Sequence, residues 1–316
     1  MYTSTLLTAI TLALSASTAT AADAQPRALV YRGPQACKGC AEAVGKLLEG
    51  SAQKFAVTYV GPKEDNQISA DLLSQAAVYA QPGGPDLNSA YRELKEHSSE
   101  IRTFVQNGGR YLGFCLGAFL AGDTPGFGLL PDGMNAVAER KSDGAQVTST
   151  EDTMIQVDWN YRTKVGTYSQ GETATRKWVY FQDGAVITGI PKDNNNTVLG
   201  RYSSNGNVAA SLTPLGKGWV ALVGPHPEAT PDWSTASAVR AYRLKNPDGV
   251  TFDIGYDFVN AAMDAGPVPT GTSSTTGAPK PTSSQESGWS SLGRGRGRMT
   301  LQNPIGFVVQ GLRNML

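Results

Sequence analysis

Short apolar runs alternate with segments of helical spacing over the first part of the chain. The apolar runs, typical of buried strands, are residues 28–31, 55–60, 76–80 and 110–113. The segments with helical character are residues 41–48, 71–74, 88–107 and 116–121. In the first of these segments Val44, Leu47 and Leu48 fall on one face. Strands that alternate with helices favour a parallel sheet with helices on both of its faces.

After Val137 the pattern changes to short alternating strands, separated by turns rich in Asn, Asp and Gly. These predicted strands are residues 154–159, 177–181, 185–187, 197–202 and 208–212. The dipeptides Asp183-Gly184 and Asn205-Gly206 are typical of hairpin turns. We therefore predict an antiparallel extension that rejoins the main sheet at residues 219–223 and is followed by a helix at 250–264. The predicted fold class is α/β, with a mainly parallel sheet flanked by helices and an antiparallel β extension.

Both ends of the chain differ in composition from residues 22–265, which we expect to form the folded domain. Residues 1–21 carry an apolar stretch and end in the small-x-small pattern Ala19-Thr20-Ala21, which predicts a secretory signal peptide rather than a short membrane anchor. Residues 266–316 are dominated by Ser, Thr, Pro and Gly and then by Arg-Gly repeats, with too little apolar area to fold. We expect a solvated stalk there, or a weak contact to a cell wall, membrane surface or partner.

Composition and charge narrow the classes of partner. The 316 residues are 40% hydrophobic and have a formal net charge of zero, so no charge excess favours nucleic acid as a partner. No segment after the signal peptide approaches the roughly 18 uninterrupted apolar residues of a membrane span, so we expect no stable membrane insertion. Together with the signal peptide, this predicts a secreted, extracellular protein, and its oligomeric state stays open. Asn195 begins the sequon Asn195-Asn196-Thr197, a predicted glycosylation site.

The segment Gly113-Phe114-Cys115-Leu116-Gly117 has the pattern of a nucleophile elbow. It follows a predicted strand and precedes a small-residue helical run, so the chain is expected to turn sharply and lift the Cys115 side chain into the open. Gly113 and Gly117 flank the turn where any Cβ would crowd the strained backbone.

His226 and Glu228 follow the apolar run 219–223 and complete a possible triad with Cys115. A His two residues before a Glu can place an imidazole beside the thiol and a carboxylate behind the imidazole. The chain has only two histidines, and His97 lies in a charged helical segment that we interpret as solvated. His226 is therefore the single candidate base.

The three cysteines are an odd number, which leaves one thiol unpaired in an oxidising compartment. Cys37 and Cys40 are the natural disulfide pair, and Cys115 is the remaining thiol. The pair is either a structural disulfide that stiffens its loop or a redox motif, and Cys115 is either a nucleophile or a buried inert residue. The chain lacks the further Cys or His residues that a zinc site would need, so we expect no metal and no cofactor.

In combination, these motifs resemble the class I glutamine amidotransferase-like fold, which is flavodoxin-like. More specifically, the chain is similar to the biotin–protein ligase N-terminal-domain family in a secreted, fungal-type form. The segments that carry the resemblance are residues 30–34, 79–84, 108–117, 179–181 and 216–228. The resemblance implies that Cys115 is the nucleophile, that His226 takes and returns the thiol proton, and that Glu228 fixes the imidazole tautomer. It also implies an oxyanion hole formed by the backbone N–H of Leu116 and one N–H from Gly83 or Gly84.

Departures from the amidotransferase sequence pattern argue against glutamine amidotransfer. Phe119 stands where glutaminases carry a glutamine-binding Gln, and Gly224-Pro225 replaces the usual Gln-Phe before His226. We therefore expect no glutamine amidotransfer. Without a biotin-ligase catalytic module, biotin transfer is not expected either. The hypothesis is a hydrolase acting on an amide, a γ-glutamyl-type bond or a thioester in a small-molecule or peptide-like substrate. The alternatives are a catalytically silent binding or surface protein on the same fold and, third, a redox protein using Cys37 and Cys40.

Overall fold

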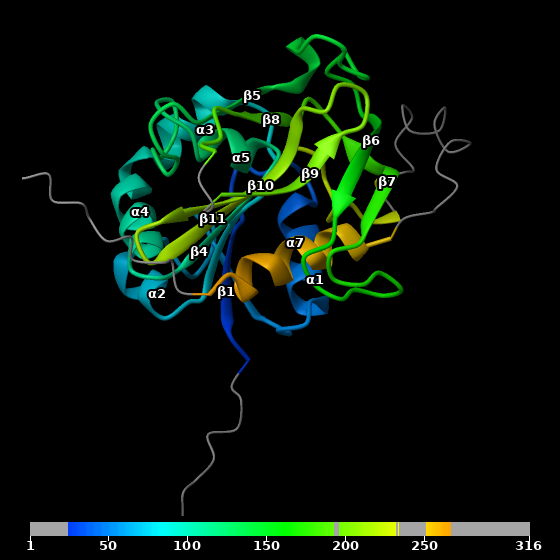
Figure 1. Cartoon of the computed structure of the whole chain (residues 1–316). Coiled ribbons are helices and arrows are strands. Elements are labelled where there is room, and N and C mark those ends of the chain that lie inside the picture. The colour runs from blue at the N-terminus through cyan, green and yellow to red at the C-terminus, as the bar shows by residue number, and fades with distance from the viewer. Residues whose placement is uncertain (1–24, 193–195, 232, 234–250, 267–316) are drawn as a thin grey trace, which may run out of the picture. The chain divides into compact units, whose positions relative to one another are not determined.

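The computed structural model describes residues 25–192, 196–231, 233 and 251–266 (Figure 1). These residues belong to one compact unit. The predicted signal peptide, Asn195 of the sequon and all but the first residue of the predicted tail lie outside the described residues. The predictions made for them stay predictions.

Five parallel strands form the centre of the sheet, in the order β2-β1-β3-β4-β11. They are β1 (Arg27–Tyr31), β2 (Ala56–Val60), β3 (Val78–Gln81), β4 (Arg110–Phe114) and β11 (Gly218–Val223). With β11 in fifth place, the order is that of flavodoxin-like doubly wound sheets. In such sheets ligands bind outside the carboxyl ends of the strands.

The other strands continue the sheet beyond β11 in antiparallel fashion (Figure 1). They are β10 (Val208–Leu215), β9 (Thr197–Tyr202), β6 (Thr153–Asn160) and β7 (Thr173–Phe181), with β8 (Ala185–Thr188) pairing both β10 and β5 (Asn135–Ala138). The mainly parallel, helix-flanked sheet with its antiparallel extension confirms the predicted fold class. β5 was not predicted, because four residues are too few to show a clear alternation.

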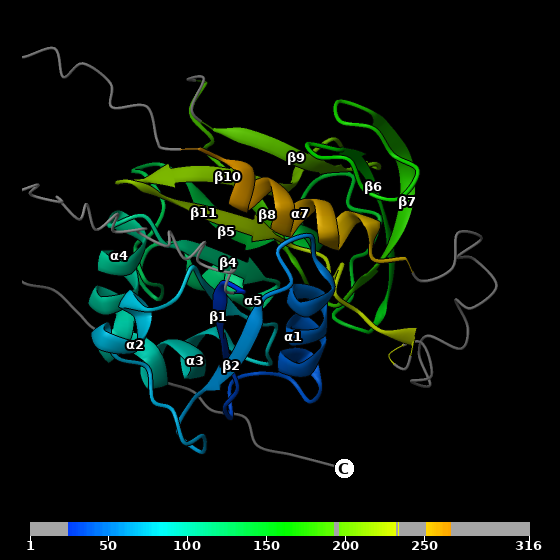
Figure 2. The ribbon, with the colours of Figure 1, turned by 90° about the horizontal axis from the view of Figure 1, so that it is seen from below.

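Helices cover both faces of the parallel strands (Figure 2). On one face lie α1 (Cys40–Gly50) and α7 (Asp253–Asp264); on the other lie α2 (Ala70–Ser74), α3 (Leu87–Leu94), α4 (Ser98–Gln106) and α5 (Leu116–Leu120). Successive strand residues point to opposite faces. Val30 and Phe114 therefore pack in the core beneath α1 and α7, whereas Leu29 and Tyr111 pack in the core beneath the other helices.

The single long helix predicted at 88–107 is wrong. The chain instead forms α3, a 3-10 turn η1 (Lys95–His97) and α4. α3 contacts α5 and α4 contacts β4 and β11, and Leu94, Ile101 and Phe104 all pack in the same core. His97 is also less solvated than expected, because its side chain is half-buried and its Nδ1 lies 3.0 Å from Oε2 of Glu100.

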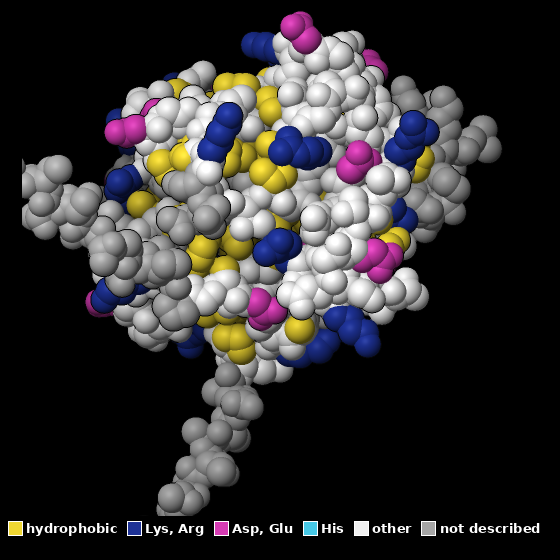
Figure 3. All heavy atoms as spheres, in the orientation of Figure 1, with side chains coloured by type: hydrophobic (Ala, Val, Ile, Leu, Met, Phe, Trp, Pro, Cys, Tyr) yellow, Lys and Arg dark blue, Asp and Glu magenta, His cyan; other side chains and the backbone are white. Residues whose placement is uncertain are grey.

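Helix hydrophobicity and surface charge bear on which partners the protein could bind. Among the described residues, no helix combines the length and apolar character needed to cross a bilayer. On the face shown in Figure 3, basic and acidic side chains of the described residues are interspersed rather than gathered by sign.

Candidate active site

The carboxyl ends of four neighbouring parallel strands carry the predicted site residues. Cys37 follows β1, Gly83 and Gly84 follow β3, Cys115 follows β4, and His226 follows β11. Because these strands are adjacent and parallel, their carboxyl ends meet at one edge of the sheet. The structure thus brings together residues that are far apart in the sequence.

Cys115 has a strained backbone between β4 and α5. Its φ of 48° and ψ of −104° lie outside the regions that residues with a Cβ usually adopt. Its N–H donates to the carbonyl of Val223 at 2.9 Å, which extends the β4–β11 ladder by one bond. As expected, the flanking glycines are in close contact. A Cβ on Gly113 would lie 2.5 Å from the carbonyl oxygen of Gly117, and one on Gly117 would clash with the carbonyl of Gln81.

Two buried tyrosines support the elbow from below. The Tyr111 hydroxyl donates to the carbonyl of Gly117 at 2.7 Å, and the Tyr79 hydroxyl donates to Oε1 of Gln81 at 2.8 Å. Both rings are fully buried, and they stack with their centroids 6.0 Å apart. The carbonyl left free by the sharp turn is therefore satisfied without water.

His226 and Glu228 form a buried pair beside the elbow. Nδ1 of His226 lies 2.8 Å from Oε1 of Glu228, and the two residues are 3% and 0% exposed. The other carboxylate oxygen, Oε2, has no hydrogen-bond partner among the described residues. A buried carboxylate with one partner directs its charge to that partner, so Glu228 favours an imidazole protonated at Nδ1.

Charge around the imidazole favours its protonated form. Burial by itself would lower the pKa of His226, but its electrostatic and hydrogen-bonding interactions with Cys115 and Glu228 outweigh burial and raise it to about 10. These interactions thus favour an imidazolium beside Cys115 at neutral pH.

The chain on either side of His226 holds the ring in place. The His226 N–H donates to the carbonyl of Tyr180 at 2.8 Å, at an isolated bridge between the end of β7 and the segment after β11. The rings of Tyr180 and Trp233 pack edge-on against the imidazole, with centroids 5.7 and 5.3 Å away. Gly224, at one of the positions where the sequence departs from amidotransferases, has no room for a side chain because the Ala185 carbonyl and the Tyr202 hydroxyl fill that space.

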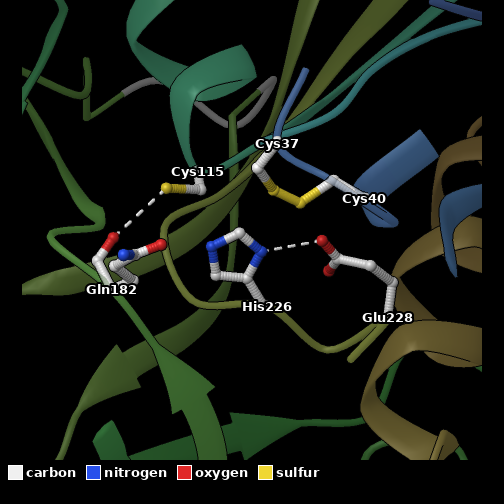
Figure 4. The surroundings of a disulfide bond; sticks show 6 residues. All are labelled: Cys37, Cys40, Cys115, Gln182, His226 and Glu228. Carbon is white, nitrogen blue, oxygen red and sulfur yellow. Dashed lines mark hydrogen bonds and ion pairs between the residues drawn. A yellow bond between two sulfur atoms is a disulfide. The ribbon is translucent and has the colours of Figure 1, made fainter. Parts of the chain in front are cut away.

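The Cys115 thiol has a second polar neighbour that the sequence did not suggest. Its Sγ lies 3.5 Å from the backbone carbonyl of Gln182, to which the thiol can donate (Figure 4). In Figure 4 the imidazole lies between Cys115 and Glu228, while the thiol points towards Gln182. Gln182 lies in the predicted Asp183-Gly184 turn, and Arg140 holds that turn through a 2.7 Å ion pair to Asp183.

Gly83 and Gly84 contact the elbow closely. A Cβ on Gly83 would lie 2.5 Å from Cε1 of His226 and 3.5 Å from Cβ of Cys115. A Cβ on Gly84 would lie 2.5 Å from a methyl carbon of Leu116 and would clash with the Gln35 carbonyl. Leu116 is the first residue of α5, where the N–H has no partner within the helix. The three residues proposed for the oxyanion hole therefore border the nucleophile.

A pocket of about 600 Å³ opens over Cys115. Its apolar lining includes Leu87, Leu116, Phe119 and Ala138, and its acidic lining is Asp86 and Asp183. Phe119 thus faces the pocket at the position where a glutaminase would hold its substrate with Gln. A second pocket, of about 680 Å³, lies between α2, α4 and the start of β4, and no cysteine or histidine is among its described lining residues.

Cys37 and Cys40 form a disulfide, as predicted from their spacing. Cys37 lines the pocket over Cys115, whereas Cys40 is fully buried at the start of α1. Within the described ranges, no group of three or more His, Cys, Asp or Glu side chains is arranged to hold a metal ion.

Comparison with known proteins identifies the family. The family model described as "Biotin-protein ligase, N terminal" matches residues 27–248. The chain belongs to this family. A biotin–protein ligase from Schizosaccharomyces pombe is 26% identical over 219 residues, which are 65% of this chain and 34% of that protein. This chain thus spans about a third of the length of that relative.

Solved structures are more distant. A GMP synthase-related protein from Thermoplasma acidophilum is 13% identical, with a TM-score of 0.45 over 75% of this chain and 94% of that one. A glutamine amidotransferase is 17% identical, with a TM-score of 0.42 over 68% of this chain and 97% of that one. At such values these structures support no conclusion about chemistry.

Sequence reasoning missed several residues that surround Cys115, His226 and Glu228. It assigned no role to Tyr180, although residues 179–181 were among the segments that resembled the family, and it overlooked Trp233 and Gln182. The signal available was the Asp183-Gly184 turn, which predicts a hairpin but not which carbonyl faces the thiol.

Proposed function

We propose that this protein is a secreted cysteine hydrolase that cleaves an amide, γ-glutamyl or thioester-type bond in a small-molecule or peptide-like substrate. The observation that carries the proposal is the buried His226–Glu228 pair, 2.8 Å apart, placed beside a strained cysteine at the end of a parallel strand. A base fixed by a carboxylate, next to a thiol on a sharp elbow, is the arrangement used for nucleophilic acyl transfer.

The chemical steps follow from the charges of the site. Sγ of Cys115 attacks the carbonyl carbon of the substrate, and the new oxyanion accepts hydrogen bonds from the N–H of Leu116 and of Gly84. His226 gives a proton from Nε2 to the departing amine or thiolate, which leaves a thioester on Cys115. Water then attacks the thioester, His226 accepts its proton, and the acid product leaves with the thiol restored.

The pocket supports a substrate that is not glutamine. Phe119 offers an aromatic surface where a polar group would be needed, and Leu87 and Leu116 extend that surface. No Lys or Arg is among the described pocket-lining residues that could pair with the α-carboxylate of a free amino acid. We therefore favour a substrate with an apolar group next to the scissile bond.

Localisation and partners belong to the same proposal. A disulfide persists in oxidising compartments, which supports secretion. Biotin transfer is not proposed, because fold and family membership do not carry the activity of a whole relative of which this chain spans about a third. We propose no nucleic-acid partner and no stable membrane insertion.

The test is the rate at which iodoacetamide alkylates Cys115 near neutral pH, followed by mass spectrometry of the Cys115 peptide. In the wild-type protein we expect rapid alkylation. His226→Ala is expected to slow it by about 10²-fold, because the imidazolium that stabilises the negative sulfur is lost. Glu228→Gln is expected to slow it less, because the imidazole remains but its tautomer is no longer fixed.

His97→Ala and Glu100→Gln are the matched controls, since these two residues form another histidine–glutamate pair and lie outside the pocket over Cys115. Both should leave the alkylation rate unchanged. Slow alkylation of Cys115 in the folded wild-type protein would overturn the proposal. If labelling is rapid, a panel of γ-glutamyl anilides, peptide amides and acyl thioesters then identifies the scissile bond.

One observation favours a second candidate, a catalytically silent binding protein. The Cys115 thiol points to the Gln182 carbonyl rather than to the imidazole, as a satisfied, inert thiol would (Figure 4). The same alkylation experiment separates the two candidates, because a silent protein would show neither rapid labelling nor dependence on His226.

A further inference from the structure

One backbone hydrogen bond joins the loop after β1 to the turn after β3. The N–H of Cys37 donates to the carbonyl oxygen of Gly83 at 2.9 Å. Gly83 is also the residue that packs directly against His226 and Cys115. The position of Cys37 therefore sets the position of the peptide that joins Gly83 to Gly84.

This bond also determines where the Gly84 N–H points. The carbonyl of Gly83 and the N–H of Gly84 belong to one planar trans peptide, so they point in opposite directions. Holding the carbonyl on Cys37 fixes the direction of the N–H. Within the described part of the chain, the Gly84 N–H donates to no backbone acceptor. Gly84 itself lines the pocket that contains Cys115.

The disulfide anchors Cys37 to a rigid element. Its partner Cys40 is the first residue of α1 and is fully buried, and α1 packs against β1, β2 and α7 through residues such as Val44 and Leu47. Between the two cysteines, Gly39 adopts a left-handed φ of 82°. Without the disulfide, Cys37 is tied to α1 only through this turn and a 3.0 Å bond from the Cys40 N–H to its carbonyl.

We propose that the Cys37–Cys40 disulfide positions the Gly83–Gly84 peptide so that its N–H stabilises the oxyanion formed on Cys115. The inference rests on the proposed hydrolase function. In this proposal the disulfide acts through the Gly83–Gly84 peptide, so both cysteines are positioning residues. The oxidised protein is the form competent in acyl transfer, and reduction weakens stabilisation of the oxyanion while leaving the nucleophile in place.

Two reactions of the Cys115 sulfur distinguish a loss of oxyanion stabilisation from a loss of thiol reactivity. Iodoacetamide is attacked at its CH₂ group and releases iodide, so no tetrahedral oxyanion forms. p-Nitrophenyl acetate is attacked at its carbonyl and forms an oxyanion, then a thioester on Cys115 and free p-nitrophenolate. The ratio of acylation rate to alkylation rate therefore reports the oxyanion donors and not the reactivity of the thiol.

The variant to test is Cys37→Ser/Cys40→Ser, which keeps the N–H of residue 37 and removes only the cross-link. Complete loss of one oxyanion donor typically costs about 10²–10³ in rate. For a displaced donor we expect acylation to fall by about 10- to 100-fold, with alkylation changed by less than about 2-fold. Lys38→Ala changes an exposed side chain of the same loop, keeps the disulfide and should leave both rates unchanged.

A second measurement covers the case in which the double variant does not fold. Wild-type protein is reduced with dithiothreitol, freed of the reductant, assayed by following the Cys115 peptide, and then reoxidised. Reduction should lower the acylation-to-alkylation ratio, and reoxidation should restore it. A Cys115→Ser protein treated in the same way supplies the background from the thiols of Cys37 and Cys40.

The outcomes are distinct. Loss of acylation alone supports the inference. Equal loss of both reactions, or no loss of either, overturns it while the hydrolase proposal stands. If Cys115 of the oxidised wild-type protein reacts with neither reagent, the proposed function fails and the inference fails with it.

Discussion

The parallel and antiparallel halves of the sheet contribute to the candidate site in different ways. From the parallel strands come Cys115, His226 and the glycine turn, each in the short segment that follows a strand end. The antiparallel extension contributes the pocket wall and packing, through Gln182 and Tyr180. The candidate site residues thus lie on sharp turns at one edge of the sheet, whereas the extension shapes the surroundings of those turns.

Two buried carboxylates, one beside the elbow and one beside the extension, differ in how completely they are hydrogen-bonded. Around the elbow, Oε2 of Glu228 is left without a partner in the described chain. Where α7 meets the extension, the buried carboxylate of Asp257 accepts hydrogen bonds from Nε1 of Trp159 (2.9 Å), the N–H of Arg162 (3.0 Å) and the N–H and hydroxyl of Thr163 (both 2.7 Å). A fully bonded carboxylate stabilises the fold, while a half-bonded one keeps its charge available to a neighbour. Substitutions should therefore separate stability from reactivity.

The largest expected effect is on stability alone. Asp257→Ala leaves several buried donors without an acceptor, so we expect the free energy of unfolding to fall by about 4 kcal/mol. In the protein that remains folded, the iodoacetamide rate at Cys115 should stay within about 2-fold of wild type. Urea unfolding and peptide labelling measure the two quantities. Asp158→Ala, which removes a half-buried carboxylate from the extension, serves as the milder control.

Gly117→Ala should affect both stability and reactivity. The new Cβ would clash with the Gln81 backbone carbonyl, and relief of that clash shifts the elbow. We expect a loss of about 3 kcal/mol in stability and a large loss of Cys115 labelling. Gly206→Ala is the comparison in the extension: φ is +75° and no atom lies within 4 Å of the added Cβ. For Gly206→Ala we expect backbone strain to lower the free energy of unfolding by about 1 kcal/mol, with no change in Cys115 labelling.

His226 is expected to make stability depend on pH. The pKa of His226 in the folded protein is about 10, above the ordinary value of 6.5. The contribution of protonated His226 to the free energy of unfolding is therefore fully present below pH 6.5 and is lost as the pH rises through 10. We expect His226→Gln to lower stability by about 2 kcal/mol at pH 6, as for a hydrogen bond to a charged group. By pH 10.5 the difference from wild type should largely disappear. A difference that grows with pH would contradict a protonated His226.

The smallest expected effect on stability comes from removing the Tyr111 hydroxyl beneath the elbow. Tyr111→Phe removes the hydroxyl that donates to the Gly117 carbonyl and leaves a buried acceptor unsatisfied, at a cost of about 1 kcal/mol. Because the ring remains, the elbow should keep its shape, and Cys115 labelling should change by only a few-fold. Thermal unfolding combined with labelling at pH 7 tests this.

Much of the parallel half was predictable because its signals are local. The run 110–113 followed by Gly113 and Gly117 predicts a strand and a turn that tolerates no side chain, and the structure has both features. The pairing of Cys37 with Cys40 followed from the same kind of local pattern. The proposed roles of Cys115, His226 and Glu228 stay predictions until reactivity is measured.

The rest of the fold and of the candidate site depends on contacts between distant segments, which no short stretch of sequence encodes. The break at Lys95–His97 leaves Leu94 and Ile101 in the same core, and the helical spacing of residues 88–107 does not reveal it. That the Gln182 carbonyl faces the thiol depends on how the β7–β8 turn meets β4, and the packing of Trp233 on His226 depends on the path of the chain after β11. Such arrangements are decided by tertiary structure.

The central place of β11 has a consequence for the order in which the protein is assembled during synthesis. β4 emerges early, but the strand that covers its other side is made only after the whole extension, and the Cys115 N–H lacks its acceptor until Val223 has been added. Until then the elbow has an open edge and an unsheltered thiol. Cys37 and Cys40 are three residues apart and can pair before any distant strand is made. Early closure of that small ring removes two competing thiols while Cys115 is still exposed, and it leaves Cys115 as the unpaired sulfur once the last strand is made.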